Sequence, residues 1–187
     1  MAKVLVAYRS KYGYTKKYAQ WLAAELDADI FPVSKIRPGM LDAYSTIILG
    51  SGVYAGNIGG TEKLFSNLEK LAGKKLIIFT CGIADVSDAE SMAEINAIIS
   101  AKIPEAIRAH VKIFNLQGGI DYGKLSFKHK IMMGIVHKAF SSMKIENLSY
   151  NNRMFLESYG KNNDFTDKKN IAEIVDYCME PANPDEE

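Results

Sequence analysis

The chain has 187 residues, a length that fits one domain with a sizeable core and leaves little room for two. Hydrophobic residues make up 48% of the sequence and aromatic residues 10%, which excludes a disordered or fibrous chain. The formal net charge is +1, so no overall field attracts nucleic acid or anionic lipid. We therefore expect one globular domain over residues 1–187 that binds no nucleic acid.

The N-terminal stretch and the cysteines indicate a cytoplasmic protein. The first ten residues, MAKVLVAYRS, run straight into a strand and lack the apolar stretch and cleavage site of a signal peptide. No apolar run approaches the roughly 20 residues that a membrane helix needs. Cys81 and Cys178 allow one disulfide but no secreted-type framework. Peripheral contact with a membrane stays open.

Short apolar runs alternate with segments of helical spacing along the chain. The predicted strands are 4–8, 29–33, 46–49, 76–79 and 111–116. The predicted helices are 15–26, 61–71, 92–99 and 166–178, with Thr61 as the N-cap of the second. Pro32 places the second strand at a sheet edge. The alternation predicts an α/β fold with a doubly wound five-stranded parallel sheet, which binds ligands beyond the carboxyl ends of its strands.

The loop after the first strand offers groups that bind phosphate. Ser10 and Thr15 supply hydroxyls, Gly13 permits close approach of the backbone, and the following helix supplies unpaired N–H groups. The Gly-Lys-Ser/Thr ending of a Walker loop is absent. The alternative is an ordinary strand-to-helix turn with Thr15 as N-cap.

The stretch from Val6 to Leu22 resembles the FMN-phosphate signature of flavodoxins. The resemblance is carried by Tyr8, Ser10, Gly13, Thr15, Ala19 and Leu22, while Ala7 stands where the family usually has a bulkier residue. It implies a flavodoxin-like fold with FMN as cofactor. The residues implied at the phosphate are Ser10, Lys11, Tyr12, Gly13, Tyr14 and Thr15.

The loop from Gly50 to Gly60 is the one that flavodoxins place over the flavin ring. By resemblance, Tyr54 stacks on the isoalloxazine and Ser51, Gly52 and Val53 give backbone contacts. The alternative is a partly exposed turn tyrosine. Residues 50–55 also match the dinucleotide pattern G-x-G-x-x-A, but the glycines continue to Gly60 and the acid about 20 residues on, Glu69, falls within a predicted helix.

The loop after the fourth strand holds the other side of the ring in flavodoxins. The resemblance assigns cofactor contacts here to Thr80, Cys81, Gly82 and Ile83. Backbone N–H groups in such a loop bond the flavin and tune its potential. Cys81 is either a ring contact or a small packing residue at a strand end.

An insert of about fifty residues, 118–165, separates the fifth strand from the last helix. No acidic residue lies between Asp121 and Glu146. The lysines of this stretch, Lys124, Lys128, Lys130, Lys138 and Lys144, alternate with the apolar residues Phe127, Ile131, Met132, Met133, Ile135, Val136 and Phe140. A helix over 124–138 suits a large apolar anion, a membrane interface or a partner protein, or it packs on its own domain. His129 and His137 lack a zinc-site pattern, so no metal is expected.

The overall layout is similar to that of the flavodoxin-fold, menaquinone-dependent protoporphyrinogen dehydrogenases of heme biosynthesis. The resemblance rests on the FMN loop and on the insert, which opens at residues 118–123. It implies an FMN-dependent oxidoreductase that moves electrons from a bulky apolar or anionic, porphyrin-like substrate to a quinone or redox partner protein. The alternative is a flavodoxin-type electron carrier without its own substrate. No residue is identified as a catalytic acid or base.

Overall fold

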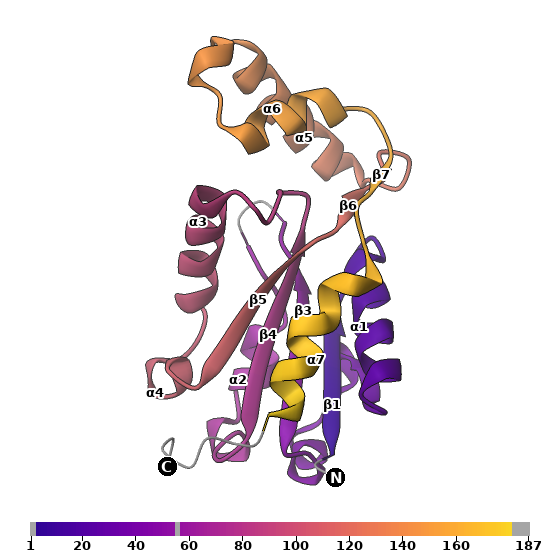
Figure 1. Ribbon diagram of the computed structural model, residues 1–187, viewed down its shortest axis with the longest axis vertical. Helices are drawn as coiled ribbons and strands as arrows, with labels where there is room; N and C mark the ends of the chain where they lie inside the picture. The colour runs from indigo at the N-terminus through magenta and orange to yellow at the C-terminus, as the bar shows by residue number, and fades with distance from the viewer. Residues whose placement is uncertain (1–2, 55–56, 181–187) are drawn as a thin grey trace.

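The computed structural model describes residues 3–54 and 57–180, and its centre is a five-stranded parallel sheet (Figure 1). The strands lie in the order β2-β1-β3-β4-β5, and every neighbouring pair is parallel. Their bounds are β1 Val4–Arg9, β2 Asp29–Pro32, β3 Thr46–Gly52, β4 Lys75–Gly82 and β5 Val111–Gln117. The predicted doubly wound fold is confirmed, and Pro32 ends an edge strand, where its missing N–H costs no ladder bond.

Helices cover both faces of the sheet and bury its apolar side chains. The helices are α1 Tyr14–Glu25, α2 Thr61–Phe65, α3 Ala89–Ser100, α4 Glu105–Arg108, α5 Phe127–Ser141, α6 Tyr150–Ser158 and α7 Ala172–Met179. The described part of the chain also contains the 3-10 segments Val33–Lys35, Pro38–Ala43, Leu68–Lys70, Ile145–Asn147 and Lys168–Ile171. One core cluster joins Val6 and Ile48 to α1 and α7, and the other joins Leu5 and Leu49 to α2 and α3. Each strand therefore has apolar residues on both faces.

The insert lies beyond the carboxyl ends of the strands. A short antiparallel pair, β6 Gly119–Ile120 with β7 Asn163–Asp164, forms its base. Helices α5 and α6 stand above this base and pack against each other, as the upper part of Figure 1 shows. In a sheet of this topology, the carboxyl end is the edge where ligands bind. The fold therefore brings the insert to the predicted site.

Two helix starts differ from the expected ones. Helix α1 begins at Tyr14 with Gly13 as N-cap, and α2 begins at Thr61 with Gly60 as N-cap, so neither Thr15 nor Thr61 is a capping residue. Both glycines are left-handed, with φ of 102° and 97°. This conformation is open to glycine at little cost, and it turns each chain sharply from strand-end loop into helix.

Two predicted helices, 61–71 and 166–178, are only partly α-helical and include 3-10 segments. The helix predicted over 61–71 ends at Phe65 and resumes only as a 3-10 turn, and the last helix starts as 3-10 at Lys168.

Cys81 and Cys178 are free thiols, so the disulfide that the sequence allows does not form. None of the described helices is both long and apolar enough to cross a membrane.

Candidate functional site

Two adjoining cavities lie at the carboxyl ends of the central strands and share Tyr54 and His129. The larger, here called the polar cavity, has a volume of about 520 Å³ and is lined by Arg9, Ser10, Lys11, Ser51, Gly52, Tyr54, Asn57, Ile58, Gly59, Glu62 and His129. The second, the apolar cavity, has about 240 Å³ and is lined by Tyr12, Tyr14, Thr15, Val53, Tyr54, Cys81, Gly82, Ile83, Gly119, Ile120, Leu125, His129, Met132 and Met133. Together they offer one polar and one apolar compartment side by side.

The loop between β1 and α1 opens onto both cavities. The Gly13 N–H donates to Ser10 Oγ at 3.1 Å, which leaves the Ser10 hydroxyl proton for another acceptor. The N-cap of α1 makes no side-chain hydrogen bond, and the first N–H groups of any helix lack intrahelical partners. A carbon built at the Cβ position of Gly13 would meet nothing within 4 Å. The loop thus presents free donors and open space to an anion.

The charge of the polar cavity also favours an anion. Arg9 and Lys11 contribute two positive charges and Glu62 one negative charge to its lining. The buried Ser51 stabilises the facing loop, because its Oγ accepts the Gly59 N–H at 3.0 Å. The Lys11 N–H, by contrast, donates to the Tyr54 hydroxyl at 3.0 Å.

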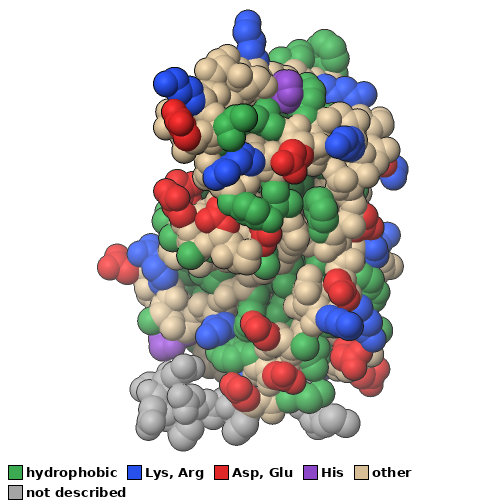
Figure 2. All heavy atoms as spheres, turned by 45° about the horizontal axis from the view of Figure 1, so that its top comes forward, with side chains coloured by type: hydrophobic (Ala, Val, Ile, Leu, Met, Phe, Trp, Pro, Cys, Tyr) green, Lys and Arg blue, Asp and Glu red, His purple; other side chains and the backbone are tan. Residues whose placement is uncertain are grey.

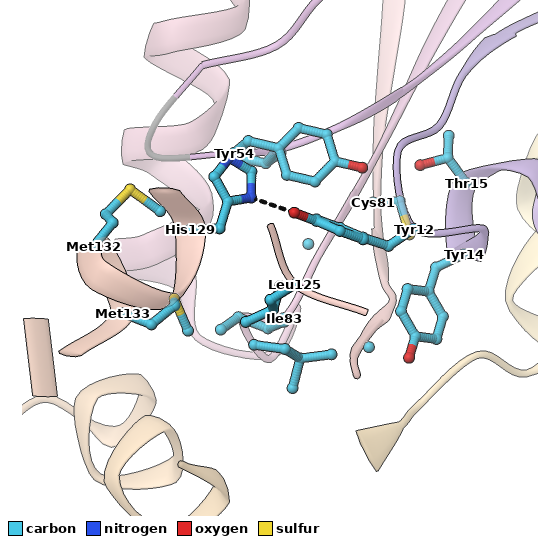
Figure 3. A pocket seen from close by; sticks show the side chains of 14 residues that line it. Tyr12, Tyr14, Thr15, Tyr54, Cys81, Ile83, Leu125, His129, Met132 and Met133 are labelled. Atoms are coloured by element: carbon cyan, nitrogen blue, oxygen red, sulfur yellow. Dashed lines mark hydrogen bonds between the residues drawn. The ribbon is translucent and has the colours of Figure 1, made fainter. Parts of the chain in front are cut away.

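The apolar cavity is roofed by helix α5. In Figure 3, His129, Met132 and Met133 lie on one side of this cavity, and Leu125 and Ile83 lie beside them. Its inner wall includes the buried Cys81, where burial raises the pKa of the thiol to about 12. A neutral thiol, thioethers and aliphatic chains make a lining suited to a flat apolar ring.

A cluster of three rings joins the roof to the loop after β1. The Tyr12 hydroxyl lies 2.7 Å from Nδ1 of His129, and the Tyr54 ring lies 5.8 Å from each of the other two (Figure 3). Tyr12 Oη also accepts the Ser126 N–H at 3.3 Å, so one hydroxyl links the imidazole to the residue that precedes α5. Burial, followed by the charge of Lys11, lowers the pKa of His129 and keeps the ring neutral.

Twelve of the fourteen sequence-predicted site residues line one of the two cavities. They are Ser10, Lys11, Tyr12, Tyr14, Thr15, Ser51, Gly52, Val53, Tyr54, Cys81, Gly82 and Ile83. Gly13 shapes the loop without lining either cavity. Thr80 is buried in β4, and its hydroxyl donates to Asn115 Oδ1 at 2.6 Å within the sheet.

The cofactor contacts predicted from the sequence do not include His129, Met132 and Met133, although the helix predicted over 124–138 is interpreted there as a surface for a large apolar anion, a membrane or a partner protein. The signal was present in the run Ile131-Met132-Met133, whose adaptable side chains often line binding surfaces. Lys124, Lys128, Lys130 and Lys138 are exposed and line neither cavity. His137 is also outside the site, because its ring stacks on Tyr159 at 3.9 Å.

A family model described as "Flavodoxin domain" matches residues 5–144, and the chain belongs to this family. The match includes all five sheet strands, both cavity loops and helix α5. Flavodoxins are FMN-binding proteins that transfer electrons to redox partners, so the cofactor predicted from the sequence is that of the family.

Individual relatives are more distant. An uncharacterized protein of Methanocaldococcus jannaschii is 36% identical over 81 residues, and the match covers 42% of this chain and 53% of that protein. The chain thus spans about half the length of this curated relative. Among solved structures, oxidised Flavodoxin 2 from Bacillus cereus is 26% identical with a TM-score of 0.47, covering 62% of this chain and 84% of that one. A flavodoxin from the domain Archaea is 15% identical with a TM-score of 0.42, covering 73% and 97%.

Proposed function

We propose that this protein is an FMN-dependent oxidoreductase that takes electrons from a bulky apolar or anionic substrate and passes them to a quinone or a protein acceptor. The observation that carries the proposal is the position of helix α5, which covers the apolar cavity. Residues of α5 lie over the apolar cavity at the end of the sheet where flavodoxins bind FMN. A covered apolar compartment is suited to receiving a substrate beside the cofactor.

The residues present fit the phosphate of FMN. The uncapped start of α1, the Ser10 hydroxyl and the nearby Arg9 and Lys11 charges supply donors and positive potential. The Lys11 N–H is engaged by the Tyr54 hydroxyl, so Tyr54 must release it if that N–H is to serve a phosphate. This loop, with Ser10, Lys11, Tyr12, Gly13, Tyr14 and Thr15, would hold the phosphate end.

The apolar cavity fits the ring end of the same cofactor. Val53, Tyr54, Cys81, Gly82 and Ile83 bring backbone and apolar side chains to it. FMN bound there supplies an acceptor for hydride or for single electrons. The chain's part is to orient the ring, to exclude water with α5, and to keep the neutral His129 imidazole at the boundary of the two cavities.

The proposed electron donor is a large apolar molecule, with protoporphyrinogen as the first candidate, which would place the protein in heme biosynthesis. Support comes from the basic insert, whose lysines surround the roof and attract anions from solution. On the other side, the Asp88 carboxylate accepts from Asn151 Nδ2 of α6, and the Asp85 backbone N–H donates to Asn151 Oδ1 while its carboxylate accepts from Ser87. An anionic substrate therefore approaches over α5 and not past Asp88.

The second candidate function is electron transfer between partner proteins without a small substrate. Membership in the flavodoxin family favours it, because flavodoxins are electron carriers. The insert argues against it, since a carrier exposes the flavin edge to its partner whereas α5 covers this cavity.

Anaerobic mixing of the FMN-loaded protein with protoporphyrinogen in one experiment, and with a chemically reduced partner protein in another, separates the two functions. We expect a small donor to bleach the flavin absorbance. Met132→Ala with Met133→Ala should slow that reduction several-fold when each sample is saturated with FMN, whereas the exposed Met143→Ala should not. Reduction by the partner protein alone would establish the carrier function and overturn the proposal.

A further inference from the structure

Helix α5 has two faces, and only one of them belongs to the candidate site. Successive residues of a helix advance by about 100°, so Phe127, Ile131 and Ile135 form one stripe along it. His129, Met132 and Met133, which line the cavity, lie on the opposite side. The stripe has no function in the proposed oxidoreductase.

This outer stripe is exposed apolar surface. The exposed fractions of Phe127, Ile131 and Ile135 are 78%, 50% and 65%. The turn that follows α5 extends the patch with Met143 at 44% and Ile145 at 73%. Large apolar side chains gathered in this way on one helix mark an interaction surface.

The charged side chains of α5 itself are lysines, and the first acidic residue after it, Glu146, lies 3.8 Å from Lys144. Lys128, Lys130 and Lys138 are exposed, and within residues 3–54 and 57–180 none of them forms an ion pair. No acidic residue lies between Asp121 and Glu146. Figure 2 shows lysine or arginine side chains among apolar ones at the end of the molecule that carries α5, with acidic side chains also present there.

We propose that the outer face of α5 docks on an anionic phospholipid bilayer, with Phe127, Ile131 and Ile135 entering the interface and the three lysines contacting lipid phosphates. A helix with apolar residues on one side and flanking lysines lies in the plane of such an interface. At 15 residues α5 is too short to span a bilayer. A second copy of the chain fits less well, because two lysine-rich faces repel each other.

Cosedimentation of the full chain with vesicles tests the proposal. We expect binding to vesicles of phosphatidylcholine and phosphatidylglycerol (3:1), little binding to pure phosphatidylcholine, and loss of binding at high salt. Phe127→Ser with Ile135→Ser should abolish binding. The matched control, Val86→Ser with Met179→Ser, replaces exposed apolar residues outside α5 and should bind as the wild type does.

A lysine set tests the charge separately. Lys128→Gln, Lys130→Gln and Lys138→Gln together should weaken vesicle binding on the order of a hundredfold, since each lysine near an anionic surface contributes about fivefold. The control set, Lys70→Gln, Lys102→Gln and Lys112→Gln, removes the same charge near the amino ends of β4 and β5 and should have little effect.

Three results would overturn the proposal. They are no binding of the wild type to anionic vesicles, equal binding by the α5 variants, and a lipid-independent dimer that the Phe127 and Ile135 changes dissociate. FMN affinity, measured on the same samples, is a separate readout. If the protein did not bind FMN, the proposed function would be contradicted, but the proposed membrane-binding face of α5 would not be.

Discussion

The hydroxyl of Tyr12 lies 2.7 Å from Nδ1 of His129, a contact that joins the loop after β1 to the insert across 117 positions of sequence. The same oxygen accepts the N–H of Ser126, the residue that precedes α5. The loop proposed to hold phosphate and the roof of the apolar cavity are therefore tied at one point. A change at either side of this contact is expected to reach the other.

The pH dependence of stability should report the neutral state of His129. Its folded-state pKa is lowered from the ordinary 6.5, so the unfolded chain takes up this proton first as the pH falls. Well above pH 6.5 both the folded and the unfolded state are neutral at this site. Below it, the wild type should lose stability relative to His129→Gln, which keeps an acceptor for Tyr12 but does not titrate.

Urea unfolding at pH 7.5, 6.5 and 5.5 measures this difference. The comparison at pH 7.5, where the imidazole of His129 is neutral in both states, is the reference against which the lower pH values are measured. A wild type that gains stability relative to His129→Gln on acidification would show that the folded state favours the charged imidazole.

Thr15→Ala should weaken FMN binding by about 1–2 kcal/mol, the scale of one hydrogen bond to a charged group. The Thr15 side chain is buried at the start of α1 and lines the apolar cavity, and its hydroxyl also bonds the Cys81 thiol. Thr15→Ser restores the hydroxyl and should recover most of the affinity in a fluorescence titration. If both variants bind FMN like the wild type, Thr15 has a structural role alone.

The sheet strands and the cofactor loops can be predicted from local sequence, whereas the position of α5 over the apolar cavity cannot. Continuous apolar runs such as 46–49 identify buried strands, and parallel topology then brings their carboxyl ends to one edge. The contact between Tyr12 and His129 depends on how α5 folds back over that edge. The sequence separation of Tyr12 and His129 does not predict this contact, because the tertiary packing of α5 over the sheet edge brings the two residues together.

The same reasoning explains the two misplaced helix caps. Threonine is a common N-cap, so Thr15 and Thr61 were the natural expectation. In both places a left-handed glycine precedes the helix and takes the capping position instead. Glycine is permissive about backbone conformation, so its presence alone does not tell which angles it adopts.

Tyr54 should have two separable effects on FMN. Its ring lines both cavities, and its hydroxyl accepts the Lys11 N–H in the phosphate loop. Tyr54→Ala should loosen FMN and raise the residual flavin fluorescence, because a stacked aromatic ring quenches it. Tyr54→Phe keeps the ring and frees the Lys11 N–H, so it should bind FMN at least as tightly as the wild type. Unchanged fluorescence and affinity in Tyr54→Ala would make Tyr54 a turn residue only.

Gly119→Ala should destabilise the base of the insert by roughly 1–3 kcal/mol, the usual cost of overpacking. A Cβ at this position would lie 2.4 Å from the backbone oxygen of Asn163 in the paired strand. Gly39→Ala is the matched control, because a Cβ there meets nothing within 4 Å. The unfolding temperature and the hydrogen-exchange protection of α5 are measured for both variants. Equal values for the two variants would show that the β6–β7 pair accommodates the added methyl group without loss of stability.

Calorimetric titration of the cofactor-free protein with FMN, riboflavin, FAD and NADH tests the central claim most directly. The account predicts one FMN per chain, and riboflavin, which lacks the phosphate, bound at least about a hundredfold more weakly, the equivalent of one or two charge-assisted hydrogen bonds. It also predicts weaker binding of FAD and NADH, since no adenosine pattern adjoins the loop from Ser10 to Thr15. Riboflavin bound as tightly as FMN, or FAD or NADH bound more tightly, would contradict it.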